Sequence, residues 1–239
     1  MIKFLDLQQI NAAYQTQFQD KLNLVLANGW FILGEEVNAF ETNFAAYCGT
    51  QYCIGVGNGL DALVLIFKGY IELGLLQKGD EVIVPANTYI ASILAILQAD
   101  LVPVLVEPSI ETYNLNPDLI LEKITTKTKV ILAVHLYGQL AEMEKINSIA
   151  KEHNLVVIED AAQAFGSQWN GKKIGSFGDL VSFSFQANKN LTTIEGGCLV
   201  LNNADEAKLA EKFRLQGLTR QGMDGMDVDV LGGKDNLTD

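Results

Sequence analysis

The sequence is poor in cysteine, proline and basic residues. It holds 3 cysteines and 4 prolines in 239 residues, and its 17 lysines and arginines are outnumbered by 29 aspartates and glutamates. The formal net charge of -12 argues against general affinity for nucleic acid, because such affinity needs clustered basic side chains that neutralise phosphates. A small anionic ligand is not excluded, since backbone amides at the start of a helix can bind a phosphate.

The few cysteines also exclude two kinds of site. Cys48, Cys53 and Cys198 form neither a metal-binding spacing nor an even-numbered disulfide framework, so we expect reduced thiols and no metal site. The N-terminus lacks the basic start and apolar run of a signal peptide, and no stretch reaches the ~18 apolar residues of a membrane helix. These features predict a cytoplasmic protein without a membrane or nucleic-acid partner.

Strand-like and helix-like segments alternate along the chain. Short aliphatic or β-branched runs predict strands at 54–56, 81–84, 102–106, 130–135 and 155–158. Two further strands, which could pair as a hairpin, are predicted at 181–185 and 198–201. Apolar residues at helical spacing predict helices at 11–28, 37–47, 60–73, 90–98, 142–153 and 204–215, and a short one from Pro117. Apolar strands separated by helices predict an α/β fold with a mostly parallel sheet covered on both faces. The remainder, 216–239, is predicted to be a loop.

Polar residues that directly follow strands are the candidates for a site, because ligands of such sheets bind beyond the carboxyl ends of the strands. The segment 57–62 lies between a short strand and a long helix. Its glycines would let a ligand approach the backbone, and the helix start offers unpaired amides to a phosphate. A tight turn without a ligand is the alternative, and the third glycine of a dinucleotide fingerprint is missing. Tyr89 follows the strand at 81–84 and could stack on a flat cofactor ring, although an aromatic residue there is commonly core.

Asp160 and Lys189 are the candidates for chemistry. Asp160 follows the strand at 155–158 and could hold a proton on a heteroaromatic nitrogen, but aspartate equally suits the N-cap of a helix. Lys189 follows the strand at 181–185, where an ammonium is costly to desolvate and a desolvated amine becomes nucleophilic. A lysine on a surface loop is the alternative reading.

The order and spacing of these residues are more specific than any one of them. The phosphate turn and the aromatic residue are followed by Asp160, by Gln163 three residues later, and by Ser184 and then Lys189, 29 residues after the aspartate. This set resembles the DegT/DnrJ/EryC1/StrS family of fold-type I, pyridoxal-phosphate-dependent nucleotide-sugar aminotransferases. The resemblance covers essentially the whole chain, through the segments 4–7, 29–34, 79–85, 134–138, 159–163 and 189–197.

The resemblance implies a role for each residue in binding pyridoxal 5'-phosphate. Lys189 would form the Schiff base and move the proton between substrate and cofactor, and Asp160 would pair with the pyridinium nitrogen. Gln163 would lie near the ring and its phenolic oxygen, and Tyr89 would stack on the ring face. The remaining cofactor-binding residues would hold the phosphate: the amides of Gly59 and Leu60 and the hydroxyl of Ser184.

The implied reaction is a transamination for amino-sugar and polysaccharide biosynthesis. Glutamate would give up its amino group, and a keto group on a nucleotide-linked deoxysugar would receive it. The overall similarity favours a 3-keto-6-deoxyhexose on thymidine diphosphate. Members of the family work as homodimers with shared active sites, so the intact protein is expected to be a homodimer.

The chain departs from the family pattern in three places. Gln186 stands where many relatives have histidine. Residues 232–235 replace the aromatic residues of a loop that reaches the partner's site, which leaves Lys234 or Asn236 for the cross-subunit phosphate contact. Relatives continue into a small C-terminal domain. Residues 1–239 are therefore expected to be the N-terminal segment and large cofactor-binding domain of a chain truncated at the C-terminus.

Three other functions fit the sequence less well. Deoxysugar dehydratases share the fold but typically carry histidine in place of the lysine, so Lys189 argues against them. A non-catalytic, regulatory binding protein on the same fold is disfavoured by the complete set of Asp160, Gln163 and Lys189, although truncation makes it relevant for this chain. A nicotinamide enzyme is disfavoured by the missing fingerprint.

Overall fold

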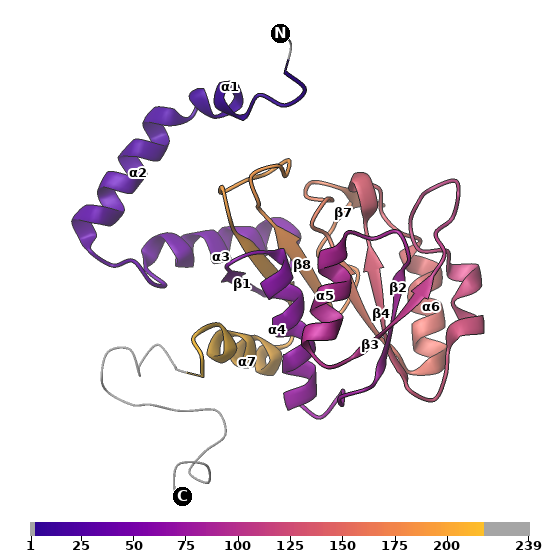
Figure 1. Ribbon diagram of the computed structural model, residues 1–239. Coiled ribbons are helices and arrows are strands. Elements are labelled where there is room, and N and C mark those ends of the chain that lie inside the picture. The colour runs from indigo at the N-terminus through magenta and orange to yellow at the C-terminus, as the bar shows by residue number, and fades with distance from the viewer. Residues whose placement is uncertain (1–2, 218–239) are drawn as a thin grey trace, which may run out of the picture. The chain divides into compact units, whose positions relative to one another are not determined.

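The computed structural model describes residues 3–217 of the chain, which forms two compact units, Met1–Phe40 and Glu41–Asp239 (Figure 1). The first unit contains α1 (Leu7–Ala12), α2 (Gln15–Asn28) and the start of α3 (Glu35–Cys48). Gly29 ends α2 in the left-handed conformation with φ 66°, as the Asn-Gly pair predicts. Within residues 3–217, no helix is long and apolar enough to cross a membrane.

The single helix predicted at 11–28 is two helices. The Asp6 carboxylate accepts a hydrogen bond from Gln9 N and caps α1, so the helical region begins before the apolar pattern does. Tyr14 then leaves the helical conformation, with φ -112° and ψ 4°, and its amide bonds to Asn11 O in a tight turn. The prediction was wrong here because apolar spacing carries no information about a local cap or turn.

The second unit is built on a seven-stranded sheet. Its strands are β1 (Tyr52–Val56), β2 (Glu81–Pro85), β3 (Val102–Val106), β4 (Thr128–Val134), β5 (Val156–Asp160), β8 (Leu180–Ser184) and β9 (Gly197–Leu201). They lie in the order β1-β9-β8-β5-β4-β2-β3, and every neighbouring pair is parallel except those of β9 with β8 and with β1. The predicted α/β fold with a mostly parallel sheet and a terminal hairpin is confirmed.

Helices cover both faces of this sheet (Figure 1). The helices α4 (Gly59–Glu72), α5 (Ile90–Gln98) and α7 (Ala204–Arg214) pack on one face, and α6 (Met143–His153) packs on the other. Ile158 belongs to the first core and Val157 to the second. Because side chains alternate along a strand, Asp160 points to the α4–α5 face and Glu159 to the α6 face.

The connecting segments contain short elements, of which the sequence indicated only the first: η1 (Pro117–Leu119), η2 (Leu121–Lys123), η3 (Leu136–Gly138) and a hairpin of β6 (Gln168–Trp169) with β7 (Lys172–Lys173). The hairpin was not predicted because its strands are two residues long and carry no apolar run. Of the loop predicted at 216–239, all but the first two residues lie outside the described chain, and so do Lys234 and Asn236.

A buried ion pair fixes α7 to the edge of the sheet. The Glu41 carboxylate bonds to Gly55 N at 2.8 Å and pairs with Arg214, whose Nη1 also donates to Gly55 O at 3.1 Å. Both charged side chains are nearly inaccessible to solvent. The pair therefore joins three distant parts of the chain, α3, β1 and α7.

Candidate active site

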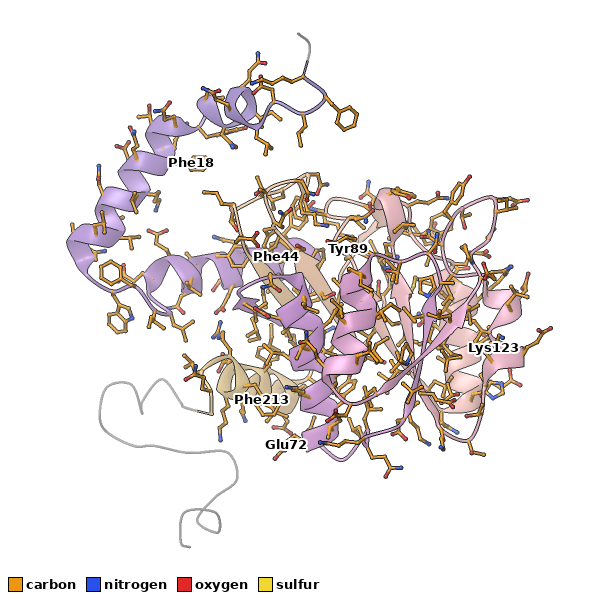
Figure 2. All side chains as sticks on the ribbon, in the orientation of Figure 1. Phe18, Phe44, Glu72, Tyr89, Lys123 and Phe213 are labelled. Carbon is orange, nitrogen blue, oxygen red and sulfur yellow. The ribbon has the colours of Figure 1, made fainter. Side chains whose placement is uncertain are left out.

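A cavity of about 490 Å³ opens at the carboxyl ends of β5 and β8, beside the N-termini of α4 and α5. Every residue that the sequence proposed for the cofactor lines it, namely Gly59, Leu60, Tyr89, Asp160, Gln163, Ser184 and Lys189. Tyr89 precedes the first turn of α5 (Figure 2) and is 69% exposed, so it is not a core residue. The fold thus brings residues from five separate segments to one edge of the sheet, and their roles remain predictions.

The N-terminus of α4 forms one end of the cavity. Asn58 caps the helix, its side chain accepting a hydrogen bond from Asp61 N at 2.8 Å. The amides of Gly59 and Leu60 are the first two of the helix, so they have no carbonyl partner within it and are suited to an anion.

Two glycines make this end of the cavity possible. A Cβ on Gly59 would lie 2.8 Å from the Cβ of Ser184, and a Cβ on Gly197 would lie 2.4 Å from the carbonyl carbon of Asn58. The start of α4 therefore rests directly on β8 and β9, and it places the Ser184 side chain next to the helix amides.

Asp160 ends β5 and is buried, with 7% of its surface exposed. Its Oδ1 accepts a hydrogen bond from Ala162 N at 3.0 Å, and its Oδ2 accepts one from Ser92 Oγ at 2.8 Å. The residues after Asp160 form turns, so it does not cap a helix as the alternative reading required. The carboxylate is held from two sides at the wall of the cavity.

Gln163 is fixed by the loop after β4. Its Oε1 accepts a hydrogen bond from Tyr137 N at 2.8 Å, which orients the side-chain amide. Tyr137 takes the left-handed conformation, with φ 57°, and is 77% exposed. The Leu136–Gly138 turn is thereby connected to the cavity through a backbone amide.

Lys189 lies in the loop between β8 and β9. Its amide bonds to Gln186 O at 2.8 Å, and Asn188 N bonds to Gln186 Oε1 at 3.1 Å, so Gln186 closes the turn that carries the lysine. The Lys189 side chain is half-buried, and no hydrogen bond or ion pair involves its Nζ within residues 3–217. An amine in this position is available to a ligand in the cavity.

Sequence reasoning missed several residues of the site. Thr88, Ser92 and Glu195 also line the cavity, and Ser92 bonds directly to Asp160. Small hydroxyl residues just after a strand could have drawn attention to Thr88 and Ser92. Nothing in the sequence, however, indicates that α5 lies against the end of β5, since 68 residues separate Ser92 from Asp160.

A buried histidine–glutamate pair lies on the opposite face of the sheet from Asp160. His135 Nδ1 accepts a hydrogen bond from Ala141 N at 3.1 Å, so the proton of the neutral ring is on Nε2. Nε2 lies 2.7 Å from Glu159 Oε2 and donates to it. Because His135 N also bonds to Asp160 O, this pair supports the backbone behind the site.

Comparison with solved structures places this fold in one class. The chain aligns with S. venezuelae DesV, solved in complex with a ketimine intermediate, at a TM-score of 0.86 and 37% identity, over 96% of this chain and 61% of that one. It aligns with E. coli GDP-4-keto-6-deoxy-D-mannose-3-dehydratase with bound hydrated PLP at a TM-score of 0.82 and 29% identity, over 90% of this chain and 60% of that one. The fold is that of fold-type I pyridoxal-phosphate enzymes.

The sequence comparisons give the family. Residues 13–239 match the DegT/DnrJ/EryC1/StrS aminotransferase family, to which the chain belongs. It is 57% identical over 215 residues to a dTDP-3-amino-3,6-dideoxy-alpha-D-galactopyranose transaminase of Aneurinibacillus thermoaerophilus, an alignment that covers 90% of this chain and 58% of the relative. The chain thus spans about three fifths of the length of each of these relatives.

Proposed function

We propose that this chain is the cofactor-binding part of a pyridoxal-phosphate-dependent aminotransferase. It would transfer the amino group of glutamate to a keto group on a nucleotide-linked deoxysugar, for amino-sugar and polysaccharide biosynthesis. One observation carries the proposal: Lys189 and Asp160 line the same cavity as Gly59 and Leu60, whose amides have no carbonyl partner within α4. Membership of an aminotransferase family and the PLP bound to the E. coli dehydratase support it.

The donor set of the cavity fits pyridoxal 5'-phosphate. The amides of Gly59 and Leu60 with the hydroxyl of Ser184 suit a phosphate at one end. The buried Asp160 carboxylate suits a protonated ring nitrogen, and Lys189 Nζ suits the aldehyde carbon. When bound, the cofactor supplies the electron sink for the bonds that break at the amino-bearing carbon.

Four of the protein's own residues would then act on the cofactor or the substrate. Lys189 Nζ would hold the cofactor and, when released, move a proton to and from the amino-bearing carbon. Asp160, fixed by Ser92 and Ala162 N, would keep the ring nitrogen protonated. Tyr89 would cover one face of the ring. Gln163, oriented by Tyr137 N, would lie near the ring and its phenolic oxygen.

The sugar is proposed from the relative at 57% identity. That protein is named for a dTDP-linked 3-amino-3,6-dideoxy sugar, so we propose a dTDP-3-keto-6-deoxyhexose as the acceptor. The dehydratase among the structural neighbours motivates the alternative, an enzyme that removes a hydroxyl group from the sugar without transferring nitrogen. Both alternatives use the same cofactor, and they differ in the product.

We further propose a homodimer with shared active sites in the cytoplasm. Residues 1–239 would form the N-terminal segment and the large domain, and Lys234 or Asn236 would reach the partner's cofactor phosphate. The exposed apolar side chains of α2, Phe18, Leu22 and Leu26, are consistent with a further contact surface. The buried free thiols of Cys48, Cys53 and Cys198 are consistent with a reducing compartment.

The cofactor proposal is tested by labelling. The purified chain is mixed with pyridoxal phosphate, its visible spectrum is recorded, and the complex is reduced with borohydride and mapped by mass spectrometry. We expect a visible band and a reduced label on Lys189, both lost in Lys189→Ala and kept in Lys123→Ala, whose lysine lies on η2 away from the cavity. A label on another lysine would overturn the assignment.

The reaction is tested with a panel of acceptors. Loaded protein is incubated with glutamate and with dTDP- or GDP-linked 3-keto and 4-keto sugars, and the products are analysed by mass spectrometry. An amino group in place of the keto oxygen of the dTDP-3-keto sugar is the expected result. Loss of a hydroxyl group without incorporation of nitrogen would support the dehydratase instead.

A further inference from the structure

Two hydroxyl groups behind the candidate site form a chain to the Asp160 carboxylate. Ser92 Oγ lies 2.8 Å from Asp160 Oδ2, and Thr88 Oγ1 lies 2.9 Å from Ser92 Oγ. Ser92 is 1% exposed, whereas Thr88 is half-buried, and both line the cavity. The hydrogen-bonded chain of hydroxyl groups therefore runs from the cavity wall, through the buried hydroxyl of Ser92, to the Asp160 carboxylate.

The charge on Asp160 would fix the direction of every hydrogen bond in this chain. An ionised carboxylate can only accept, and a serine hydroxyl has a single proton to donate. Ser92 must give that proton to Asp160, so it can only accept from Thr88, and Thr88 must donate to Ser92. Both hydroxyl protons then point towards the carboxylate, so the donor to Asp160 Oδ2 is itself held by a second donor.

The same turn also places the aromatic residue of the site. Thr88 N bonds to Pro85 O at the end of β2, and Ser92 N bonds to Tyr89 O in the first turn of α5. Tyr89 thus lies between the two hydroxyl residues in the sequence and is held by the same backbone bonds. A shift of this turn would move Tyr89 and the donor to Asp160 together.

We propose that Ser92 and Thr88 are positioning residues that hold the Asp160 carboxylate in the orientation that meets the ring nitrogen of the cofactor. They act through Asp160 rather than on the substrate. The inference rests on the proposed function, because it presupposes pyridoxal phosphate in the cavity. It goes further in assigning a role to two residues of α5 and the turn before it.

The test uses variants that remove each hydroxyl and, at position 88, one that keeps it. Ser92→Ala removes the direct donor to Asp160, and Thr88→Val removes the outer hydroxyl with little change of shape, whereas Thr88→Ser retains it. The dissociation constant of pyridoxal phosphate and the pH dependence of its visible band are measured for each protein. The urea midpoint of the unliganded protein and the borohydride label on Lys189 are recorded as controls.

We expect Ser92→Ala to raise the dissociation constant about tenfold, since a hydrogen bond to a charged group is lost. Thr88→Val should raise the dissociation constant about threefold, because Ser92 Oγ no longer accepts the hydrogen bond that fixes the direction of its own proton. In both variants the pH dependence of the band should shift, and Thr88→Ser should behave like the wild type. If Ser92→Ala does not fold, Thr88→Val and Thr88→Ser still form a complete comparison.

The outcomes separate this inference from the proposed function. Wild-type affinity and pH dependence in Ser92→Ala and Thr88→Val, with Lys189 still labelled, would overturn the inference and leave the proposed function standing. A loss of affinity without a change in pH dependence, and of the same size in Thr88→Ser as in Thr88→Val, would indicate an effect of packing alone. That result would also overturn the inference. A folded wild-type chain whose Lys189 takes no label would overturn the proposed function, and the inference with it.

Discussion

At the scale of single residues, the candidate site depends on how a few polar groups are held. Asp160 is buried and receives two hydrogen bonds, Gln163 is oriented by a backbone amide, and Lys189 Nζ has no partner within residues 3–217. Groups with fixed partners lose hydrogen bonds when they reorient, whereas an unpaired amine can bond to a ligand. The arrangement suits Asp160 as a fixed partner for a protonated group and Lys189 Nζ as an unpaired nucleophile.

Substitution of Asp160 tests the first of these roles. Asp160→Asn keeps the shape and removes the charge that would hold the proton on the ring nitrogen. We expect the rate at which glutamate transfers its amino group to the bound cofactor to fall on the order of 100-fold. Stopped-flow absorbance measures this rate, and Asp205→Asn, an exposed carboxylate on α7, serves as the control. An unchanged rate in Asp160→Asn would show that the carboxylate does not act on the cofactor.

At the scale of elements, α4 combines a polar end with an apolar body. Its first residues meet the cavity, while Ala62, Leu63, Ile66 and Phe67 are buried in the core. The core fixes the helix against the sheet, and the contact of Gly59 with Ser184 sets how closely its first amides approach the cavity. The position of the helix thus decides the geometry at the proposed phosphate site.

A pair of glycine substitutions in α4 tests this arrangement. In Gly59→Ala the new Cβ would lie 2.8 Å from Ser184 Cβ, so the helix start must shift. Overpacking of this kind costs about 1–3 kcal/mol, and we expect about tenfold weaker binding of pyridoxal phosphate.

Gly69→Ala is the matched control in the same helix. Its Cβ would meet Leu209 Cδ2 at an ordinary 3.8 Å, so cofactor affinity should be unchanged and stability should rise by up to about 1 kcal/mol. Both effects are measured by spectroscopic titration and urea unfolding. Equal cofactor affinity in the two variants would count against a role for the α4 N-terminus.

The attachment of α7 gives a prediction about stability. Arg214→Met removes the Arg214 cation from the buried Glu41 carboxylate, and the loss of one partner of a buried pair costs about 3 kcal/mol or more. We expect a correspondingly lower urea midpoint. Lys208→Met on the same helix removes an exposed cation that lies 3.7 Å from Asp205, and it should change the free energy of unfolding by less than about 0.5 kcal/mol. Similar urea midpoints in both variants would contradict a stabilising role for the ion pair of Arg214 with Glu41.

At the scale of the whole molecule, burial affects how stability depends on pH. Burial raises the pKa of the Cys48 thiol from 9.0 to about 12, and Cys53 adds to the shift. Burial also raises the pKa values of Cys198 and Tyr70. All three groups hold their protons more tightly in the folded protein than in the unfolded chain.

The sign of the effect follows from proton linkage. Below pH 9 the groups are protonated in both states, so the full contribution to stability is present. Above pH 9 the unfolded chain loses protons that the folded protein keeps, and the stabilisation is lost as pH rises towards about 12. Cys48 alone should contribute a loss of about 1.4 kcal/mol per pH unit in this range.

Urea unfolding at pH 8 and pH 10 under reducing conditions measures this loss. The free energy of unfolding should be lower at pH 10, and the difference should shrink in Cys48→Ala, which removes one of the groups. Identical pH dependence in the variant and the wild type would mean that the Cys48 thiol ionises as freely in the folded protein as in the unfolded chain.

The sequence by itself determined the alternation of strands and helices, and hence the fold class. Apolar strands such as 130–135 and 155–158 are recognisable because a parallel sheet buries both of its faces. The same pattern placed Asp160 and Lys189 just after strands, so their location at the carboxyl edge of the sheet could be predicted. The family resemblance added the roles of Gln163, Ser184 and Leu60, which spacing alone does not give.

Only the tertiary structure decided which side chains meet. The bond from Ser92 to Asp160, the support of Gln163 by Tyr137 N and the ion pair of Arg214 with Glu41 join residues that are 26 to 173 positions apart. Hydropathy patterns report which residues are buried, but not the register in which helices pack on a sheet. That register follows from the close fit of the whole core, down to the contact of Gly59 with Ser184.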